Sequence, residues 1–324
     1  MIVLLFTGGT ISMKHDARLG GAVPTLTGDE IVRLTPGLDG VAEFEVDEWG
    51  RFPGPHMTVE RMWAVRNRVA THLARPEVDG VVVTHGTDAL EESAYIVARS
   101  LPPGKPVVFT GAMRPAGDLG WDGPSNLLDA ARVASSPESR GKGALVCLDE
   151  RIHSALEVTK THTEARGAFE SPGLGALGEV DEGRVVYRRA LLRMPAPLTP
   201  EHPAEPVDIV YAWAGADARL LDASRETGAR AVVIAAMGRG NVPPPMFEGV
   251  VRWVETGRPA IVTSRALRGR VGPTYGYPGG GRRLLEAGAV FAYERRPGQA
   301  RVDCMLALGL GYDLDALRNL FAAQ

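Results

Sequence analysis

The sequence predicts an α/β protein of two domains, the larger one at the N-terminus. Short, continuous apolar runs rich in Val and Ile recur along the chain, which is typical of strands buried on both faces of a parallel sheet. Longer segments with apolar residues at helical spacing lie between these runs. We therefore expect a mostly parallel sheet with helices on both faces in the N-terminal domain, and a smaller parallel-sheet domain after it.

The N-terminal domain is predicted over residues 1–190. Its strands are indicated by "IVLLF" (2–6), "GVVVTH" (80–85), "PVVFTG" (106–111) and "ALVCL" (144–148). Its helices are indicated by "LEESAYIVARSL" (90–101) and "NLLDAARVASS" (126–136). This alternation of strands and helices favours a sheet covered on both faces.

A Pro-rich stretch, "MPAPLTPEHPAEP" at 194–206, cannot hold a regular helix or ladder and predicts a linker over residues 191–206. The alternation resumes in a second domain over 207–324. Its elements are indicated by "VDIVYAW" (207–213), "AVVIAAM" (231–237), "MFEGVVRWVET" (246–256) and "PAIVTS" (259–264), and by the amphipathic "LDALRNLFAA" (314–323).

Composition excludes several classes of partner. The 36 basic residues are nearly balanced by 39 acidic ones and form no patch, so no nucleic acid is expected. No stretch approaches the roughly 18 apolar residues of a membrane span, and the first residues lack the charged start and long apolar core of a secretory leader. Cys147 and Cys304 lie in apolar surroundings and are expected to be buried free thiols. We expect a cytoplasmic protein.

Polar residues and glycines follow three of the predicted strands. These segments are Thr7-Gly8-Gly9-Thr10, Thr84-His85-Gly86-Thr87-Asp88 and Thr110-Gly111-Ala112-Met113-Arg114. Parallel sheets bind ligands beyond the carboxyl ends of their strands, and glycine allows close backbone approach. The three strand ends therefore predict one shared polar site.

A nucleotide site is excluded by glycine spacing, because the next glycines after Gly8 and Gly9 are Gly20 and Gly21. The chain also contains no phosphate-binding loop with G-K-[ST], no serine elbow and no H-E-x-x-H helix. A threonine hydroxyl remains as the candidate nucleophile. Such a hydroxyl needs a base and donors for the oxyanion that forms on attack.

Candidates for these roles lie close by in sequence. Asp88 directly follows Thr87, and Lys160 stands among hydroxyl groups and histidines after the 144–148 strand. A lysine acts as a base only where burial or nearby charge lowers its pKa. Backbone N–H groups of the Gly-rich turns are candidate oxyanion donors.

Structural alternatives apply to the same residues. Asp88, with Glu91 three residues later, is close to a capping box, and taken by itself this capping role is favoured. The "TGGT" turn taken by itself is consistent with a tight turn after a buried strand.

Two further alternatives concern His153, His162 and Arg114. The two histidines have Cys, Asp and Glu neighbours but match no standard zinc spacing, so a hydrogen-bonded or solvated set is favoured over a metal site. Arg114 is a candidate anion clamp or, equally, an anchor for neighbouring carbonyl groups.

Taken together, these segments resemble the bacterial-type L-asparaginases, an amidohydrolase family with a larger N-terminal and a smaller C-terminal α/β domain. The similar segments are "TGGTI" (7–11), "HGTDALEESAY" (85–95), "FTGAMRP" (109–115), "DGPSNLLDA" (122–130), "KTHT" (160–163) and "GRGN" (238–241). They follow one another in the family's order along nearly the whole chain.

The resemblance implies catalytic roles for four residues. The family's nucleophilic threonine falls on Thr10, which would form an acyl-enzyme. The second catalytic threonine and its aspartate fall on Thr87 and Asp88, and the lysine falls on Lys160; these three would move protons. Ammonia would leave first, and water would then release the acid.

The resemblance also implies the substrate contacts. Backbone amides of Gly9 and Thr87 would hold the oxyanion, Asp88 would also pair with the substrate's α-ammonium, and the Ala112 carbonyl would contact the amide nitrogen. No metal and no organic cofactor would be required. The family forms homodimers and homotetramers, and one of these is expected here.

Two departures from the family pattern concern substrate choice. Ala22 stands where the family has a lid tyrosine, and Gly54 and Pro55 stand where it has a serine and a polar residue that grip the substrate. Gly54 can still offer a backbone N–H to the α-carboxylate, whereas Pro55 has none, so discrimination is expected to weaken. Tyr275 and Tyr277 are candidates for a replacement phenol from a neighbouring subunit.

The expected function is hydrolysis of L-asparagine to L-aspartate and ammonia. One alternative is an amidohydrolase for another small amide, such as glutamine, D-asparagine or a β-amide. A second is the amidase subunit of a tRNA-dependent amidotransferase, which normally carries an extra N-terminal domain. A third is a non-catalytic amino-acid-binding module.

Overall fold

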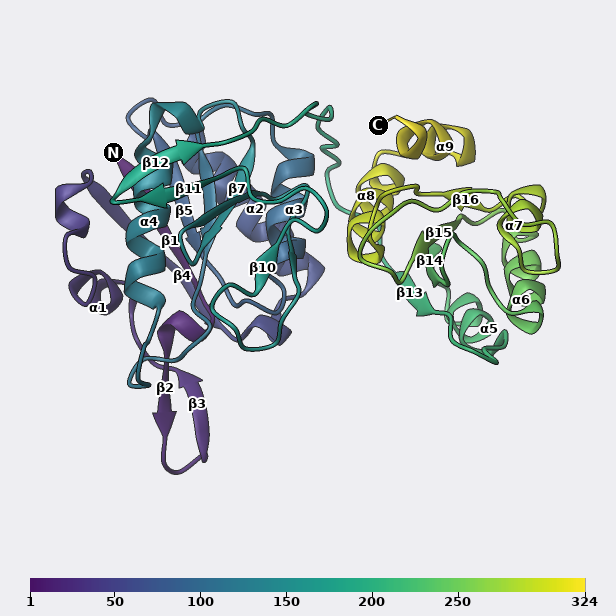
Figure 1. Cartoon of the computed structure of the whole chain (residues 1–324), viewed down its shortest axis with the longest axis horizontal. Coiled ribbons are helices and arrows are strands. Elements are labelled where there is room, and N and C mark those ends of the chain that lie inside the picture. Colours follow the sequence, from purple (N-terminus) through teal and green to yellow (C-terminus); the bar gives the residue numbers. More distant parts are fainter. Residues whose placement is uncertain (324) are drawn as a thin grey trace. The chain divides into compact units, whose positions relative to one another are not determined.

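A computed structural model describes residues 1–323 of the chain. The chain divides into two compact units, one of residues 1–197 and one that begins at Leu198 (Figure 1). The first unit holds an eight-stranded sheet and the second a four-stranded sheet. The predicted fold class, with a larger mostly parallel sheet followed by a smaller parallel one, is confirmed.

The large sheet of the first unit has the strand order β12-β11-β8-β7-β6-β5-β1-β4. Its parallel part consists of β1 (Ile2–Gly8), β4 (Phe44–Phe52), β5 (Gly80–Thr84), β6 (Val107–Thr110) and β7 (Ala144–Leu148). An antiparallel extension consists of β8 (Arg151–Ser154), β11 (Gly178–Asp181) and β12 (Arg184–Tyr187). The four predicted strands of this unit form the centre of the sheet.

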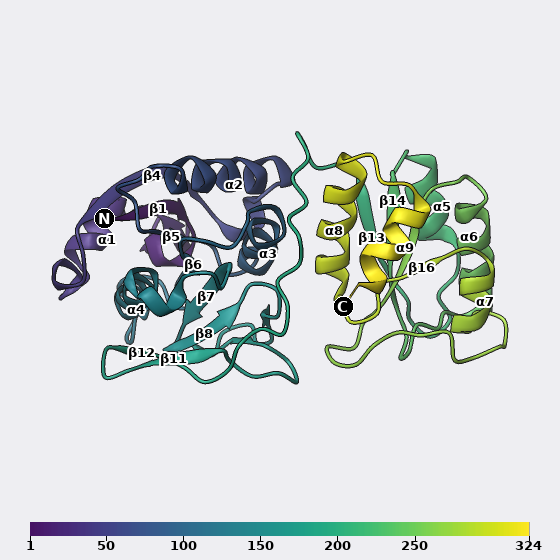
Figure 2. The ribbon, with the colours of Figure 1, turned by 90° about the horizontal axis from the view of Figure 1, so that it is seen from above.

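Helices cover both faces of this sheet. The main ones are α1 (Gly28–Arg33), α2 (Val59–Leu73), α3 (Leu90–Ser100) and α4 (Gly123–Ser135). Short 3-10 turns occur at η1 (Thr10–Ser12), η2 (Leu38–Gly40), η3 (Gly54–His56) and η4 (Pro137–Ser139). Figure 2 shows α4 on the opposite side of the strands from α2 and α3. On the α1 and α4 face, Phe6, Val82 and Leu127 belong to one buried apolar cluster.

Several elements of this unit have no buried apolar run and were not predicted. A hairpin of β2 (Met13–Asp16) and β3 (Gly21–Pro24) extends from the unit (Figure 1). A two-stranded ladder joins β9 (Thr159–Lys160) to β10 (Phe169–Glu170). The edge strand β4, "FEVDEWGRF", is charged and only partly buried, which is how natural edge strands avoid pairing with other chains.

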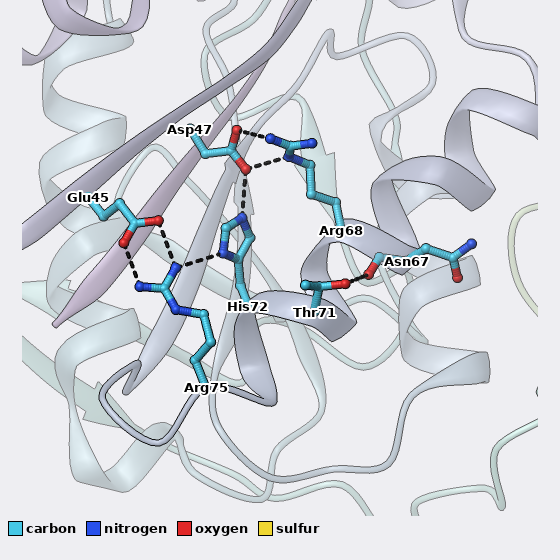
Figure 3. A network of polar contacts seen from close by, with 7 residues as sticks. All are labelled: Glu45, Asp47, Asn67, Arg68, Thr71, His72 and Arg75. Carbon is cyan, nitrogen blue, oxygen red and sulfur yellow. Dashed lines mark hydrogen bonds and ion pairs between the residues drawn. The ribbon is translucent and has the colours of Figure 1, made fainter.

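Charged side chains attach β4 to α2 (Figure 3). Asp47 of β4 is 8% exposed and accepts hydrogen bonds from Arg68 at 2.5 and 2.6 Å. The Nε2 atom of His72 lies 2.6 Å from the same carboxylate. Just beyond the end of α2, Arg75 donates two hydrogen bonds of 2.7 Å to Glu45. Bidentate pairs of this kind fix the orientation of both partners, so β4 is held in register against α2.

Backbone contact between glycines joins the far end of β4 to its neighbours. The N–H of Gly9 donates to the carbonyl of Phe52, which ends β4, at 2.9 Å. A methyl group on Gly9, whose φ is 84°, would lie 2.4 Å from the nitrogen of Gly86. A methyl group on Gly86 would lie 2.5 Å from Cα of Gly54. These three glycines, which we call the glycine contact, bring the segments after β1, β4 and β5 together with no side chain between them.

The second unit is a parallel sheet in the order β13-β14-β15-β16. Its strands are β13 (Val207–Tyr211), β14 (Ala231–Ala236), β15 (Ala260–Ser264) and β16 (Val290–Phe291). Its helices are α5 (Arg219–Glu226), α6 (Pro244–Val254), α7 (Gly281–Glu286), α8 (Pro297–Gly309) and α9 (Leu314–Ala322). Trp253 of α6, which is fully buried, packs in one apolar cluster with Ile234 and Val262 of the sheet. Residues 188–206 form no helix or strand.

Both cysteines are buried and unpaired, so the predicted free thiols are confirmed. Burial raises the pKa of Cys147 and of Cys304, which makes both thiols poor nucleophiles.

Between residues 1 and 323, no helix is long and apolar enough to cross a membrane.

The Asp47 contacts predict a pH-dependent contribution to stability. Burial by itself would raise the pKa of Asp47, but the hydrogen bonds from Arg68 and His72 outweigh it and hold that pKa below the usual 3.8. The stabilisation of the folded state by ionised Asp47 is therefore complete above about pH 4 and is lost as the pH falls further. We expect Asp47→Asn to lower the free energy of unfolding by about 1–3 kcal/mol at pH 7, measured by urea titration.

The same titration at pH 5 and pH 3.5 checks the sign. The difference between wild type and Asp47→Asn should be the same at pH 7 and pH 5, and smaller at pH 3.5. A difference that grows as the pH falls contradicts the assignment.

The glycine contact predicts that Gly86→Ala destabilises the protein. Its new methyl group would meet backbone atoms, which cannot rotate away, and overpacking of this kind costs about 1–3 kcal/mol. Gly104→Ala is the matched control, because no atom lies within 4 Å of the methyl group it would add. Equal midpoints of urea unfolding for the two variants would contradict the contact.

Candidate active site

The carboxyl ends of β1, β5 and β6 lie side by side at one edge of the large sheet. The three strands are parallel neighbours, and Phe6, Thr84 and Thr110 are in register across them. The segments that follow them are the Thr- and Gly-rich ones singled out in the sequence. One edge of one sheet thus gathers three sets of hydroxyl and backbone N–H groups, as is usual for ligand sites of parallel sheets.

Two of the threonines here are structural. The hydroxyl of Thr7 donates to the carbonyl of Thr84 at 2.7 Å, and that of Thr110 donates to the carbonyl of Cys147 at 2.8 Å. Both side chains are fully buried, so their hydroxyl groups serve to join strands. Thr84 is fully buried as well, so Thr10, which is partly exposed, and Thr87, which is 5% exposed, are left as the candidate reactive threonines.

Thr10 opens the η1 turn directly after Gly9 and is partly exposed. The turn is held by Ser12, whose backbone N–H and hydroxyl both donate to the carbonyl of Gly9, at 3.0 and 2.8 Å. Gly9 itself lies against Gly86, one residue before Thr87. In the described part of the chain, no hydrogen bond joins the Thr10 hydroxyl to Thr87, Asp88 or Lys160.

Lys160, Thr87 and Asp88 form one hydrogen-bonded cluster. The Nζ atom of Lys160 donates to Oγ1 of Thr87 at 2.9 Å and to Oδ1 of Asp88 at 2.7 Å. The lysine side chain is 17% exposed and the aspartate side chain 59% exposed. The partly buried Nζ atom of Lys160 thus bridges a hydroxyl group and a carboxylate.

The capping-box interpretation of Asp88 and Glu91 is wrong. Helix α3 begins at Leu90, its N-cap is Ala89, and no side chain caps it. The Asp88 carboxylate binds Lys160 instead, and Glu91 binds the backbone of Lys160. Both carboxylates therefore bind a lysine that is distant in sequence, and neither caps the helix.

The segment that contains Ala112 is held by Asp122 and Asn126. The Asp122 carboxylate, on the N-terminal side of α4, accepts the backbone N–H of Met113 at 3.0 Å and that of Arg114 at 2.9 Å. The side-chain amide of Asn126 donates to the carbonyl of Gly111 and to Asp122, both at 3.0 Å. This leaves the buried Ala112 between two anchored neighbours.

The structure also decides between the two expected roles of Arg114. Its guanidinium donates to the carbonyl of Leu119 at 3.0 Å, so it anchors a neighbouring carbonyl, which is one of its two expected roles. His153 and His162 are hydrogen-bonded, to Ser171 and to backbone N–H groups. Over residues 1–323, no group of three or more His, Cys, Asp or Glu residues could hold a metal ion.

The residues at the positions that depart from the family pattern lie in three places. Gly54 opens the η3 turn, is buried, and would place a methyl group 3.2 Å from Cβ of Asp88. Pro55 beside it is exposed. Ala22 lies on β3, opposite His15 in the β2–β3 hairpin. The Gly54 backbone is therefore brought to Asp88, while the Pro55 ring faces solvent.

Tyr275 and Tyr277 lie in the second unit, between β15 and α7. Their rings stack with centroids 5.5 Å apart and are 42% and 52% exposed. Tyr277 and Asn241 also line a mostly apolar pocket of about 370 Å³ beyond the carboxyl end of β14.

Sequence reasoning gave no role to His85, Asp122 or Asn126, and gave Glu91 only the capping role that the structure contradicts. Complete burial lowers the pKa of His85 to about 4, so its ring is neutral at pH 7. Because the carbonyl of Gly86 is only an acceptor, Nδ1 of His85 carries the proton and donates to it at 2.8 Å. All four residues lie within segments quoted for the family resemblance, but nothing in the sequence indicated their partners.

Comparisons with known proteins show the family to which both parts of the chain are similar. Residues 1–193 match the family described as Asparaginase, N-terminal, and residues 206–321 match the Glutaminase/Asparaginase C-terminal domain. The chain is 37% identical over 323 residues to a probable L-asparaginase of Deinococcus radiodurans, covering 99% of this chain and 96% of that one. It is 31% identical over 333 residues to L-asparaginase 2 of Bacillus subtilis, covering 99% and 85%.

A solved structure shows the same fold. The crystal structure of a probable cytoplasmic L-asparaginase from Campylobacter jejuni superposes with a TM-score of 0.89 at 28% identity, covering 99% of this chain and 98% of that one. The two matched family domains account for nearly the whole sequence. The chain belongs to the asparaginase family.

Proposed function

We propose that this member of the asparaginase family hydrolyses L-asparagine to L-aspartate and ammonia, with Thr10 as the nucleophile. The observation that carries the proposal is the Lys160–Thr87–Asp88 cluster, placed one residue from the glycine contact that adjoins Thr10. The cluster supplies groups that can accept and return a proton, and the adjacent turns supply backbone N–H donors. These are the parts that a hydroxyl nucleophile needs.

In the first half of the reaction, Oγ1 of Thr10 attacks the carboxamide carbon of the substrate. The Thr10 hydroxyl proton passes to Oγ1 of Thr87, and Thr87 gives its own hydroxyl proton to Nζ of Lys160, 2.9 Å away, which takes part in this step as the neutral amine. Backbone N–H groups of Gly9 and Thr87 hold the negative oxygen of the tetrahedral intermediate. The C–N bond then breaks, the proton returns to the nitrogen, and ammonia leaves an aspartyl ester on Thr10.

In the second half, water attacks the ester carbon and gives its proton to the same pair. The C–O bond to Thr10 breaks, the hydroxyl group is re-formed and L-aspartate leaves. One set of groups therefore serves both halves, each time taking a proton from the attacking oxygen and giving it to the leaving atom. The proposed reaction uses no metal and no organic cofactor.

Substrate binding is proposed to rest on Asp88, Gly54 and Ala112. The Asp88 carboxylate pairs with the α-ammonium, and the backbone N–H of Gly54 binds the α-carboxylate. Pro55 adds neither a side-chain nor a backbone donor. The carbonyl of Ala112 accepts a hydrogen bond from the amide nitrogen, at a position set by Asp122 and Asn126.

The setting of the reaction is also proposed. Two buried, unpaired cysteines and a structural relative named as a cytoplasmic enzyme support a cytoplasmic location.

We further propose a homodimer or homotetramer in which Tyr275 or Tyr277 of a neighbouring subunit supplies the phenol that Ala22 lacks. The exposure of both rings supports that idea.

Removal of any catalytic group should abolish most ammonia release. We expect Thr10→Ala, Thr87→Ala and Lys160→Ala each to lower kcat/KM for L-asparagine by several orders of magnitude, because groups that act as one unit are not additive. Thr71→Ala, at an exposed position on α2, is the control and should keep wild-type rates. Wild-type activity in any of the three variants would contradict the assigned roles.

Substrate analogues test whether the enzyme binds the α-ammonium group of the substrate more strongly than its α-carboxylate. Succinic acid monoamide lacks the α-ammonium, and 3-aminopropanamide lacks the α-carboxylate. We expect loss of the ammonium to cost about 10- to 100-fold in kcat/KM, as removal of a charged hydrogen-bond partner does, and loss of the carboxylate to cost less. A larger loss for 3-aminopropanamide would show that the carboxylate is the better-held group.

A further inference from the structure

Glu91 contacts the backbone of Lys160 and has no role in the proposed reaction. It lies on the first turn of α3, three residues after Asp88. Its Oε2 atom accepts the backbone N–H of Lys160 at 2.5 Å and the hydroxyl of Thr159 at 2.7 Å. One carboxylate oxygen therefore receives two hydrogen bonds from the strand that carries Lys160.

That strand has few other backbone partners. Strand β9 is two residues long, and in residues 1–323 it pairs only with the two-residue β10, outside the large sheet. Two-stranded pairing is marginal by itself, so further contacts, including the burial of Thr159 and Phe169, are needed to hold β9. Lys160 adds a four-carbon side chain with many rotamers, which costs conformational entropy to hold in one place. The position of its Nζ atom thus depends on what fixes β9.

The segment from Thr87 to Glu91 fixes Lys160 at both of its ends. Thr87 and Asp88 hold Nζ at 2.9 and 2.7 Å, and Glu91 holds the backbone nitrogen. All three come from five consecutive residues at the end of β5 and the start of α3. The partners that bind the proton-carrying nitrogen and the partner that fixes its backbone therefore belong to one local structure.

We propose that Glu91 is the positioning residue for Lys160. The inference rests on the proposed function, in which Lys160 moves protons together with Thr87. Glu91 acts by fixing β9, which places Nζ within hydrogen-bond reach of the Thr87 hydroxyl. Both of its donors are neutral groups bound to one oxygen, so the role needs an acceptor at that point and does not need the negative charge.

This last point yields a matched pair of variants. Glu91→Gln keeps an oxygen acceptor on a side chain of the same length, whereas Glu91→Ala removes it. We expect Glu91→Ala to lower kcat for L-asparagine by about 10- to 100-fold with little change in KM, because misplacement of a catalytic group by about 1 Å has costs of that order. Glu91→Gln should restore most of the loss and leave the pH profile of kcat/KM unchanged.

Glu92→Gln removes a charge from the same helical turn and is the control for a general effect of charge at this helix end; it should keep the wild-type kcat. A Glu91→Gln enzyme as slow as Glu91→Ala, or one with a displaced pH profile, would overturn the positioning role in favour of an electrostatic one. Thr159→Val removes one of the two donors and should give a smaller loss than Glu91→Ala. It provides the test if Glu91→Ala does not fold, and wild-type kcat in Thr159→Val would then overturn the inference.

A double-mutant cycle with Lys160→Ala separates this inference from the proposed function. If Glu91 acts through Lys160, Glu91→Ala should cost nothing further in a Lys160→Ala background. The same fold loss in both backgrounds would overturn the inference, while a large effect of Lys160→Ala alone would leave the proposed function standing. Full activity of Lys160→Ala would instead contradict the proposed function itself.

Discussion

The glycine contact among Gly9, Gly54 and Gly86 is the constraint on which the candidate site depends. A methyl group on Gly9 or Gly86 would come within 2.5 Å of backbone atoms of another of these glycines, closer than real Cβ atoms approach. The three segments that carry Thr10, Asp88 and the Gly54 backbone can therefore meet only where no side chain stands between them. Parallel pairing of β1 with β4 and β5 delivers these segments to one edge, and the glycines let them touch.

Two kinds of support surround this contact. On one side, β4 is fixed through Asp47, Arg68 and His72, and its last carbonyl receives the N–H of Gly9. On the other side, Asp122 and Asn126 anchor the segment after β6 by hydrogen bonds to its backbone. Binding and catalytic groups on loops need such a rigid frame, because small displacements of a reacting group cost much of the rate.

Much of the fold and part of the candidate site could be predicted from the sequence, and the features that were missed were missed for a physical reason. The central strands were predictable because burial on both faces leaves continuous apolar runs such as "GVVVT". The edge strand β4 and the hairpin that carries Ala22 were missed because an edge or projecting strand buries little and keeps its charges. Asp88 was misread as a cap because local spacing cannot reveal that its partner, Lys160, is 72 residues away. Glu91 was misread as part of the same cap for the same reason, while the family resemblance supplied the roles proposed for Thr10, Thr87 and Lys160.

The central claim is that Thr10 carries the acyl group during hydrolysis of L-asparagine. The most direct measurement is acid quenching of the enzyme during turnover, followed by proteolysis and mass spectrometry to locate a bound aspartyl group. The account predicts an aspartyl ester on the peptide that contains Thr10, and its absence from that peptide in Thr10→Ala. An aspartyl group on the peptide that contains Thr87 would contradict it.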